Sequence, residues 1–132
     1  MSLPAQVAPE EKLSRFIFSD RYFSRKDNRV RYGAFKPPPN YPLELSVFRI
    51  DNLNDEGIWQ LAAETQTRAI KARADLRCQA VLDIDLRVES DSVPHCRHAN
   101  ITGWQQQDLK ELVFATKLAN ISTLIEADAA RS

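Results

Sequence analysis

The sequence predicts an α+β fold, in which one small domain has two main helices on one face of a mixed or mostly antiparallel sheet. Apolar residues make up 43% of the 132 residues and charged residues 27%, which is typical of a single globular domain. Short segments in which apolar and polar residues alternate predict strands, and two longer segments with apolar residues three and four positions apart predict helices. Helices packed on one face of such a sheet would bury the apolar sides of both.

The strands are expected at residues 14–18, 43–50, 76–81, 82–89 and 98–102, and the helices at roughly 55–70 and 105–127. Residues 43–50 carry apolar side chains on both faces, which favours a central strand. Asn54 precedes two acidic residues, an arrangement typical of a helix N-terminus. Gly103 is expected to end the last strand.

Residues 1–13 favour a disordered lead-in because they are rich in Pro, Ala and Glu, and residues 14–132 are expected to form the domain. The N-terminal residues lack the basic start and apolar stretch of a signal peptide. No apolar run reaches the roughly 18 residues of a transmembrane helix, so no membrane partner is expected. Cys78 and Cys96 are too few for a disulfide scaffold. Together these observations favour a reduced, cytoplasmic protein.

The net charge of zero conceals an asymmetry, because residues 1–41 carry eight Lys/Arg and four Asp/Glu, and the rest carries ten and fourteen. The basic excess is densest in residues 15–36. Residues 15–41 also hold seven of the eleven aromatic residues. Basic groups interleaved with aromatic rings can hold phosphates and stack bases. Alternatively, the aromatic rings anchor a long loop on the core while the arginines stay solvated.

Residues 94–104 contain both histidines, one cysteine and one tryptophan. On the strand predicted there, His98 and Asn100 share a face, and we take both as candidate catalytic residues, with His98 as general acid and base. Alternatively, His98 packs at the strand start and hydrogen-bonds a backbone carbonyl. Trp104 follows Gly103 and either stacks on a ligand or covers the core.

No metal or cofactor is expected. His95 and Cys96 are adjacent, and the sequence lacks a C-x-x-C or H-x-x-x-H pair that would direct them onto one ion. Three glycines in the whole chain exclude a dinucleotide fingerprint and a P-loop.

Basic residues from several segments complete the candidate site. Lys71 and Arg73 follow the first predicted helix, where they also suit the negative end of its dipole. The candidate ligand-binding residues are Arg15, Arg31, Arg49, Lys71, Arg73 and Trp104.

Several short motifs carry a resemblance to a known set of proteins. They are Arg15–Phe18, Ala34–Phe35, Glu44–Ile50, Ile58–Trp59, Lys71–Leu76 and Arg97–Trp104. With these motifs, roughly residues 14–120 resemble a set of small bacterial proteins to which no activity is assigned. The resemblance implies a stand-alone bacterial, cytoplasmic domain and carries no catalytic residue over to this chain.

Three functions remain open from the sequence. The leading hypothesis is a binding or interaction module for an anionic ligand, which is a nucleotide, a nucleic acid or an acidic protein partner. The second is a small enzyme, nuclease-like or transferase-like, that acts on phosphate or nucleotide substrates through His98 with Arg49, Lys71 and Arg73. The third is a structural subunit of a homodimer or a larger complex, joined through an exposed strand edge.

Overall fold

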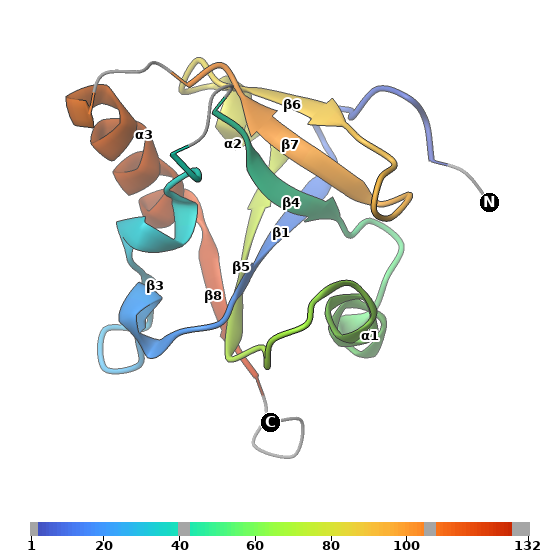
Figure 1. Cartoon of the computed structure of the whole chain (residues 1–132), viewed down its shortest axis with the longest axis horizontal. Helices are drawn as coiled ribbons and strands as arrows, with labels where there is room; N and C mark the ends of the chain where they lie inside the picture. The colour runs from blue at the N-terminus through green and yellow to red at the C-terminus, as the bar shows by residue number, and fades with distance from the viewer. Residues whose placement is uncertain (1–2, 40–42, 105–107, 128–132) are drawn as a thin grey trace.

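The computed structural model describes residues 3–39, 43–104 and 108–127 (Figure 1). The chain forms a six-stranded sheet in the order β6-β7-β4-β1-β5-β8 and a separate two-stranded hairpin, β2-β3. All the strand pairs are antiparallel. The strands are β1 (Lys12–Ile17), β2 (Phe23–Ser24), β3 (Arg29–Val30), β4 (Leu45–Arg49), β5 (Ala72–Arg77), β6 (Arg87–Ser90), β7 (His98–Thr102) and β8 (Thr123–Glu126). The α+β class and the antiparallel sheet are confirmed.

Three α-helices and two 3₁₀ turns complete the described part of the chain. The helices are α1 (Asp55–Thr65), α2 (Cys78–Leu82) and α3 (Asp108–Ile121), and the turns are η1 (Asp20–Tyr22) and η2 (Tyr32–Phe35). Asn54 caps α1 as expected, because its side-chain oxygen accepts a hydrogen bond from the Gly57 N–H at 2.8 Å. None of the helices in the described ranges has the length and hydrophobicity needed to cross a bilayer.

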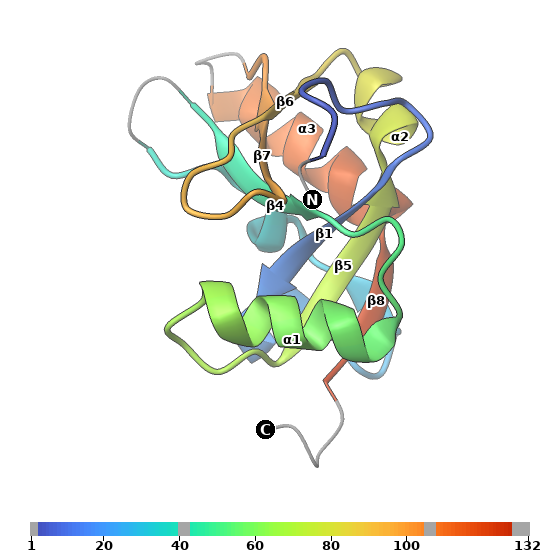
Figure 2. The same ribbon diagram turned by 90° about the vertical axis from the view of Figure 1, so that its right-hand side faces the viewer.

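The two longer helices cover opposite faces of the sheet, with α1 in front of it and α3 behind it in Figure 2. On one face, Ile58 and Leu61 of α1 belong to a buried cluster that contains Phe16 and Phe48. On the other face, Leu118 and its neighbours on α3 belong to the larger core cluster. The expectation that both helices share one face is therefore not met. The physical reason is that β1 and β4 carry apolar side chains on both faces, so each face needs its own cover.

The N-terminal segment is part of the folded domain. Arg49 donates from Nε and Nη2 to the two carboxylate oxygens of Glu11, at 2.9 and 2.8 Å, and from Nη1 to the carbonyl oxygen of Pro4 at 2.8 Å. Farther along, Ser90 Oγ donates to the Ala5 carbonyl oxygen at 2.7 Å. The sequence favoured a disordered lead-in over residues 1–13, whereas Pro4, Ala5 and Glu11 contact the domain and β1 begins at Lys12. The partners of these three residues lie tens of positions away, so they leave no local signal.

The chain between β5 and β6 differs from the expected pair of strands. β5 ends at Arg77, α2 follows directly, and β6 begins only at Arg87. Asp85 in the intervening turn has φ = 69°, a left-handed conformation that ends any strand there. Near the C-terminus, α3 ends at Ile121 and β8 pairs with β5, where the sequence predicted continuing helix.

β1 and β4 share only two register pairs, Leu13 with Arg49 and Ser14 with Phe48. By contrast, β1 and β5 share six. Beyond Ser14 no further register pair joins the two strands, and the side chain of Arg15 provides hydrogen bonds there instead. Its Nη1 donates to the Ser46 carbonyl oxygen at 3.0 Å and its Nε donates to the Ala34 carbonyl oxygen at 2.9 Å. Burial, with repulsion from Arg68, lowers the pKa of Arg15 to about 10, so the guanidinium stays charged at neutral pH.

Candidate functional site

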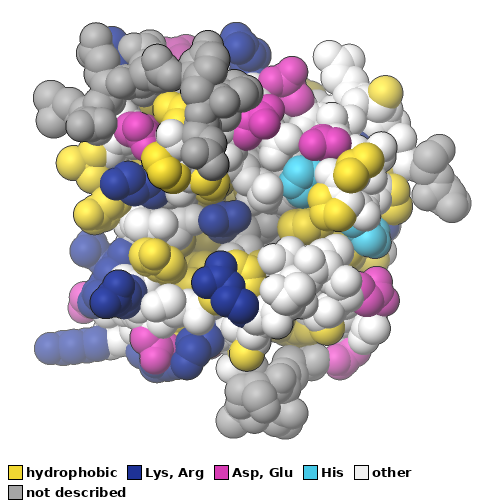
Figure 3. Space-filling view, viewed as in Figure 1, with side chains coloured by type: hydrophobic (Ala, Val, Ile, Leu, Met, Phe, Trp, Pro, Cys, Tyr) yellow, Lys and Arg dark blue, Asp and Glu magenta, His cyan; other side chains and the backbone are white. Residues whose placement is uncertain are grey.

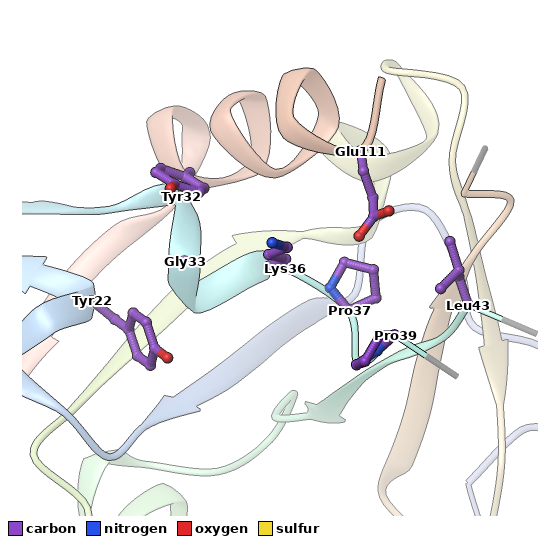
Figure 4. A pocket seen from close by; sticks show the side chains of 8 residues that line it. All are labelled: Tyr22, Tyr32, Gly33, Lys36, Pro37, Pro39, Leu43 and Glu111. Carbon is purple, nitrogen blue, oxygen red and sulfur yellow. The ribbon is translucent and has the colours of Figure 1, made fainter. Parts of the chain in front are cut away.

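A groove of basic and aromatic side chains runs between the η1–η2 region and α3. It consists of two adjoining cavities of about 690 and 460 Å³, which share Tyr22, Tyr32 and Gly33. The larger cavity extends from the tyrosines toward Lys36, Pro37, Pro39, Leu43 and Glu111, as Figure 4 shows. The smaller cavity extends toward Arg21, Arg29, Arg31, Thr116 and Asn120. We call the two together the basic–tyrosine groove.

The aromatic residues of this region divide into anchors and groove walls. Phe23 and Phe35 are buried in the core, at 3% and 0% exposure, and fix the segment on the sheet. Tyr22 and Tyr32 keep 38% and 49% of their surface exposed and border the groove. Phe23 and Phe35 therefore anchor the segment on the core, whereas the rings of Tyr22 and Tyr32 remain accessible at the surface.

Gly33 allows the ring of Tyr22 to lie against the backbone of η2. A Cβ atom at position 33 would lie 2.7 Å from Cδ1 and Cε1 of that ring, closer than any ordinary contact. The glycine is thus required for this close approach, and the approach shapes the region that the two cavities share.

Four cations line the groove, and the carboxylate of Glu111 lines the same cavity as Lys36. Arg21, Arg29, Arg31 and Lys36 are all exposed. Across residues 3–39, 43–104 and 110–127, none of the four forms an ion pair with a carboxylate. Nearby Arg25 differs, because it pairs with Asp20 at 3.2 Å and Glu126 at 2.7 Å. Figure 3 shows Lys and Arg side chains gathered on this side of the molecule.

A second constellation surrounds His98 at the start of β7. The imidazole Nε2 lies 3.0 Å from Ser46 Oγ on the neighbouring strand β4, and Nδ1 lies 3.1 Å from the Asp91 carbonyl oxygen. The Asp91 carboxylate oxygen Oδ2 is 3.7 Å from Nδ1 and accepts a hydrogen bond from Asn100 Nδ2 at 3.3 Å. In Figure 3 the histidine side chains lie toward the right of the view, whereas many Lys and Arg side chains lie toward the left.

The candidate residues from the sequence do not form one site. His98 and Asn100 come together through Asp91. Arg49 points to the opposite face of β4 from Phe48, the register partner of His98, and its guanidinium is occupied by Glu11. The enzyme hypothesis that joined His98 to Arg49 therefore has no geometric support.

The other candidates are distributed over several regions. Arg31 lines the basic–tyrosine groove, and Lys71 is exposed with Asp20 at 3.7 Å. Arg73 is buried beneath α1, where Nη2 donates to Asp55 at 2.7 Å and the guanidinium lies 4.8 Å from the ring centroid of Trp59. Trp104 is buried and donates from Nε1 to the Ile101 carbonyl oxygen at 2.8 Å, so it covers the core.

Ser46 and Asp91 were not among the residues selected from the sequence. Ser46 lies directly opposite Asn100 in the β4–β7 register, so correct pairing of the two predicted strands would have placed it there. Asp91 lies in the loop seven positions before His98, and only the path of that loop brings it to the imidazole.

The described residues hold no cluster of three or more His, Cys, Asp or Glu side chains that could bind a metal ion. Cys78 is buried, and this burial raises the pKa of its thiol. Cys96 is exposed, with Sγ 3.8 Å from Nδ1 of its neighbour His95.

Fold and surface together define an α+β domain with a basic, tyrosine-lined groove and a separate serine–histidine pair. Comparison of this chain with protein-family models, with curated proteins and with solved structures gave no match.

Proposed function

We propose that this protein binds single-stranded nucleic acid in the basic–tyrosine groove. The observation that carries the proposal is that two exposed tyrosine rings line the same groove as four cations. None of these cations forms an ion pair with a carboxylate among the described residues. Proteins that bind single strands combine a positively charged path for the phosphates with aromatic rings on which bases stack.

The shape of the groove favours a strand over a mononucleotide. The cations lie at both ends of the shared region, with Arg21, Arg29 and Arg31 in one cavity and Lys36 in the other. A ligand that reaches both ends needs more than one phosphate. A duplex fits less well, because its paired and stacked bases do not offer free faces to Tyr22 and Tyr32.

The electrostatic part of the proposal is tested by fluorescence anisotropy with a labelled oligonucleotide of about one dozen mixed bases, titrated between 50 and 200 mM salt. We expect the affinity to fall steeply with salt. The double variant Arg29→Gln/Arg31→Gln should weaken binding and reduce the slope of log K against log salt by about 0.7 for each phosphate that the protein no longer neutralises.

Arg87→Gln is the matched control, because Arg87 is exposed on β6, at the far edge of the sheet from β8. Binding that does not respond to salt, or an equal loss for the control variant, would contradict the proposal. If poly-glutamate binds as tightly as the oligonucleotide, and still does so when the tyrosines are replaced, the groove is instead assigned to an acidic protein partner.

The stacking part is tested by replacing the two tyrosines. Tyr22→Ala and Tyr32→Ala should each cost about 1–3 kcal/mol of binding free energy, the usual value for one stacked base. Tyr22→Phe and Tyr32→Phe keep the ring and should bind nearly as well as the unchanged protein. If the alanine variants bind as tightly as the phenylalanine variants, the rings do not stack on the ligand.

A further inference from the structure

Ser46 and His98 form a hydrogen-bonded pair whose proton positions follow from their surroundings. The Asp91 carbonyl oxygen lies 3.1 Å from His98 Nδ1 and can only accept a hydrogen bond, so Nδ1 carries the proton. In the neutral imidazole Nε2 is then the acceptor, and Ser46 Oγ, at 3.0 Å, donates its proton to it. A serine hydroxyl that donates to a histidine base is the arrangement by which hydroxyl nucleophiles are activated.

The remaining groups around the imidazole hold it in that orientation. The Asp91 carboxylate lies 3.7 Å from Nδ1, where its negative charge stabilises the imidazolium that forms when Nε2 takes a proton. Asn100 Nδ2 donates a hydrogen bond to Oδ2 of this carboxylate at 3.3 Å, and the Val93 N–H donates to Oδ1 at 3.3 Å. Asp91 and Asn100 are thus positioning residues for His98.

Ser46 is accessible while its base is not. The imidazole of His98 is 6% exposed and packs edge-on against the ring of Phe48, with centroids 5.4 Å apart, whereas Ser46 is exposed. Arg15 supports the backbone at this position from the other face of the sheet, by donating to the Ser46 carbonyl oxygen at 3.0 Å. The cavities of the groove do not include Ser46, so this site is separate from the one proposed for nucleic acid.

We propose that Ser46 is a nucleophile activated by His98 and that it accepts acyl groups from small, unhindered esters. Ser46 Oγ forms a bond to the ester carbonyl carbon while its proton passes to His98 Nε2. The bond from that carbon to the leaving oxygen then breaks, and His98 returns the proton to the leaving alcohol. Water releases the acyl group from Ser46 by the same route, so no other reactant is consumed.

The experiment uses a fluorophosphonate probe, in which Ser46 Oγ would form a P–O bond as the P–F bond breaks. Mass spectrometry of the intact protein and of its peptides gives the labelling rate and the modified residue. We expect one label per chain, at Ser46, and none in Ser46→Ala. Ser92→Ala is the matched control, because Ser92 is exposed in the loop next to Asp91 and should not affect labelling.

The role of the base is read from His98→Gln and from the pH profile of the unchanged protein. Loss of a general base should slow labelling about 100-fold. Because His98 is buried, His98→Gln is checked for folding by circular dichroism, and the pH profile gives a measurement that needs no variant. Labelling requires Nε2 without a proton, so its rate should depend on pH, and Asp91 is the described carboxylate that faces this imidazole.

Labelling of Ser46 no faster than that of the unfolded chain, or a rate that does not change between acid and neutral pH, would overturn the proposal. Hydrolysis of p-nitrophenyl acetate that persists in Ser46→Ala would overturn the assignment of the nucleophile.

Discussion

The arginines inside the sheet and the arginines of the groove use the same functional group in opposite ways. Arg49 and Arg73 are each only 1% exposed, and each forms an ion pair with a carboxylate of the same chain. Arg49 binds Glu11 through two hydrogen bonds, and Arg73 donates to Asp75 from Nε at 3.2 Å. The groove arginines are exposed and form no ion pair within the described residues.

This difference shows which arginines are available to a ligand. A buried guanidinium that has its carboxylate partner holds segments of the chain together, and removing it leaves a charge without a counterpart. An exposed guanidinium without a partner contributes little to folding but can bind a phosphate through two hydrogen bonds.

The largest effect is expected from Arg49→Gln. This variant leaves the Glu11 carboxylate, whose side chain is 12% exposed, without its cation. Loss of one partner of a buried pair typically costs about 3–5 kcal/mol of unfolding free energy. Urea unfolding measures this loss, and Arg21→Gln, in the groove, should stay within about 0.5 kcal/mol of the unchanged protein. Similar unfolding free energies for the two variants would contradict the distinction between buried, paired arginines and exposed groove arginines.

A smaller effect is expected from pH. Burial alone would raise the pKa of Glu11, but hydrogen bonds from Arg49 and the Ala8 N–H, and the charges of Arg49 and Arg97, outweigh it and lower the pKa below 4.5. A lowered pKa in the folded state means that this stabilisation is complete above the unfolded value and is lost as the pH falls below it.

Unfolding free energies measured from pH 7 downward should therefore decline below about pH 4.5, with a shallower decline in Glu11→Gln. The glutamine keeps the shape of the side chain but does not titrate. An identical decline in both proteins would show that Glu11 does not contribute to the pH dependence.

The smallest change in stability, with a clear change in binding, is expected from Gly33→Ala. The added methyl group must displace the ring of Tyr22, which is exposed and can move, so the unfolding free energy should change by less than about 1 kcal/mol. Oligonucleotide affinity should fall by roughly the amount expected for Tyr22→Ala, about 1–3 kcal/mol. Unchanged affinity would place the ligand away from this ring.

Local patterns in the sequence predicted the elements whose signals are local. Asn54 with the acidic residues after it identified the start of α1, and apolar residues on both faces identified β4 as a central strand. The alternation over residues 82–89 was misleading in its first half, because residues 83–85 form a turn and Leu86 is buried before β6 begins at Arg87. β8 was missed because its apolar residues continue the spacing of α3.

The sites were less predictable because they depend on pairing over long distances. The basic and aromatic character of residues 15–36 was visible, but which rings are buried depends on contacts with α3 and the sheet. His98 and Asn100 were selected from their spacing, whereas Ser46 is 52 positions away and meets His98 only through the β4–β7 register. Arg49 and Arg73 were selected for their charge, which the fold uses internally.

The short contact between β1 and β4 has a consequence for motion within the domain. With two register pairs between them, the sheet consists of two three-stranded halves, β6-β7-β4 and β1-β5-β8, that share few backbone hydrogen bonds. Opening this seam disturbs little of either half, so amide hydrogens along it should exchange with solvent sooner than those of the β1–β5 ladder. Arg15 spans the seam through its contacts with Ser46 and Ala34, and therefore sets how readily the two halves separate.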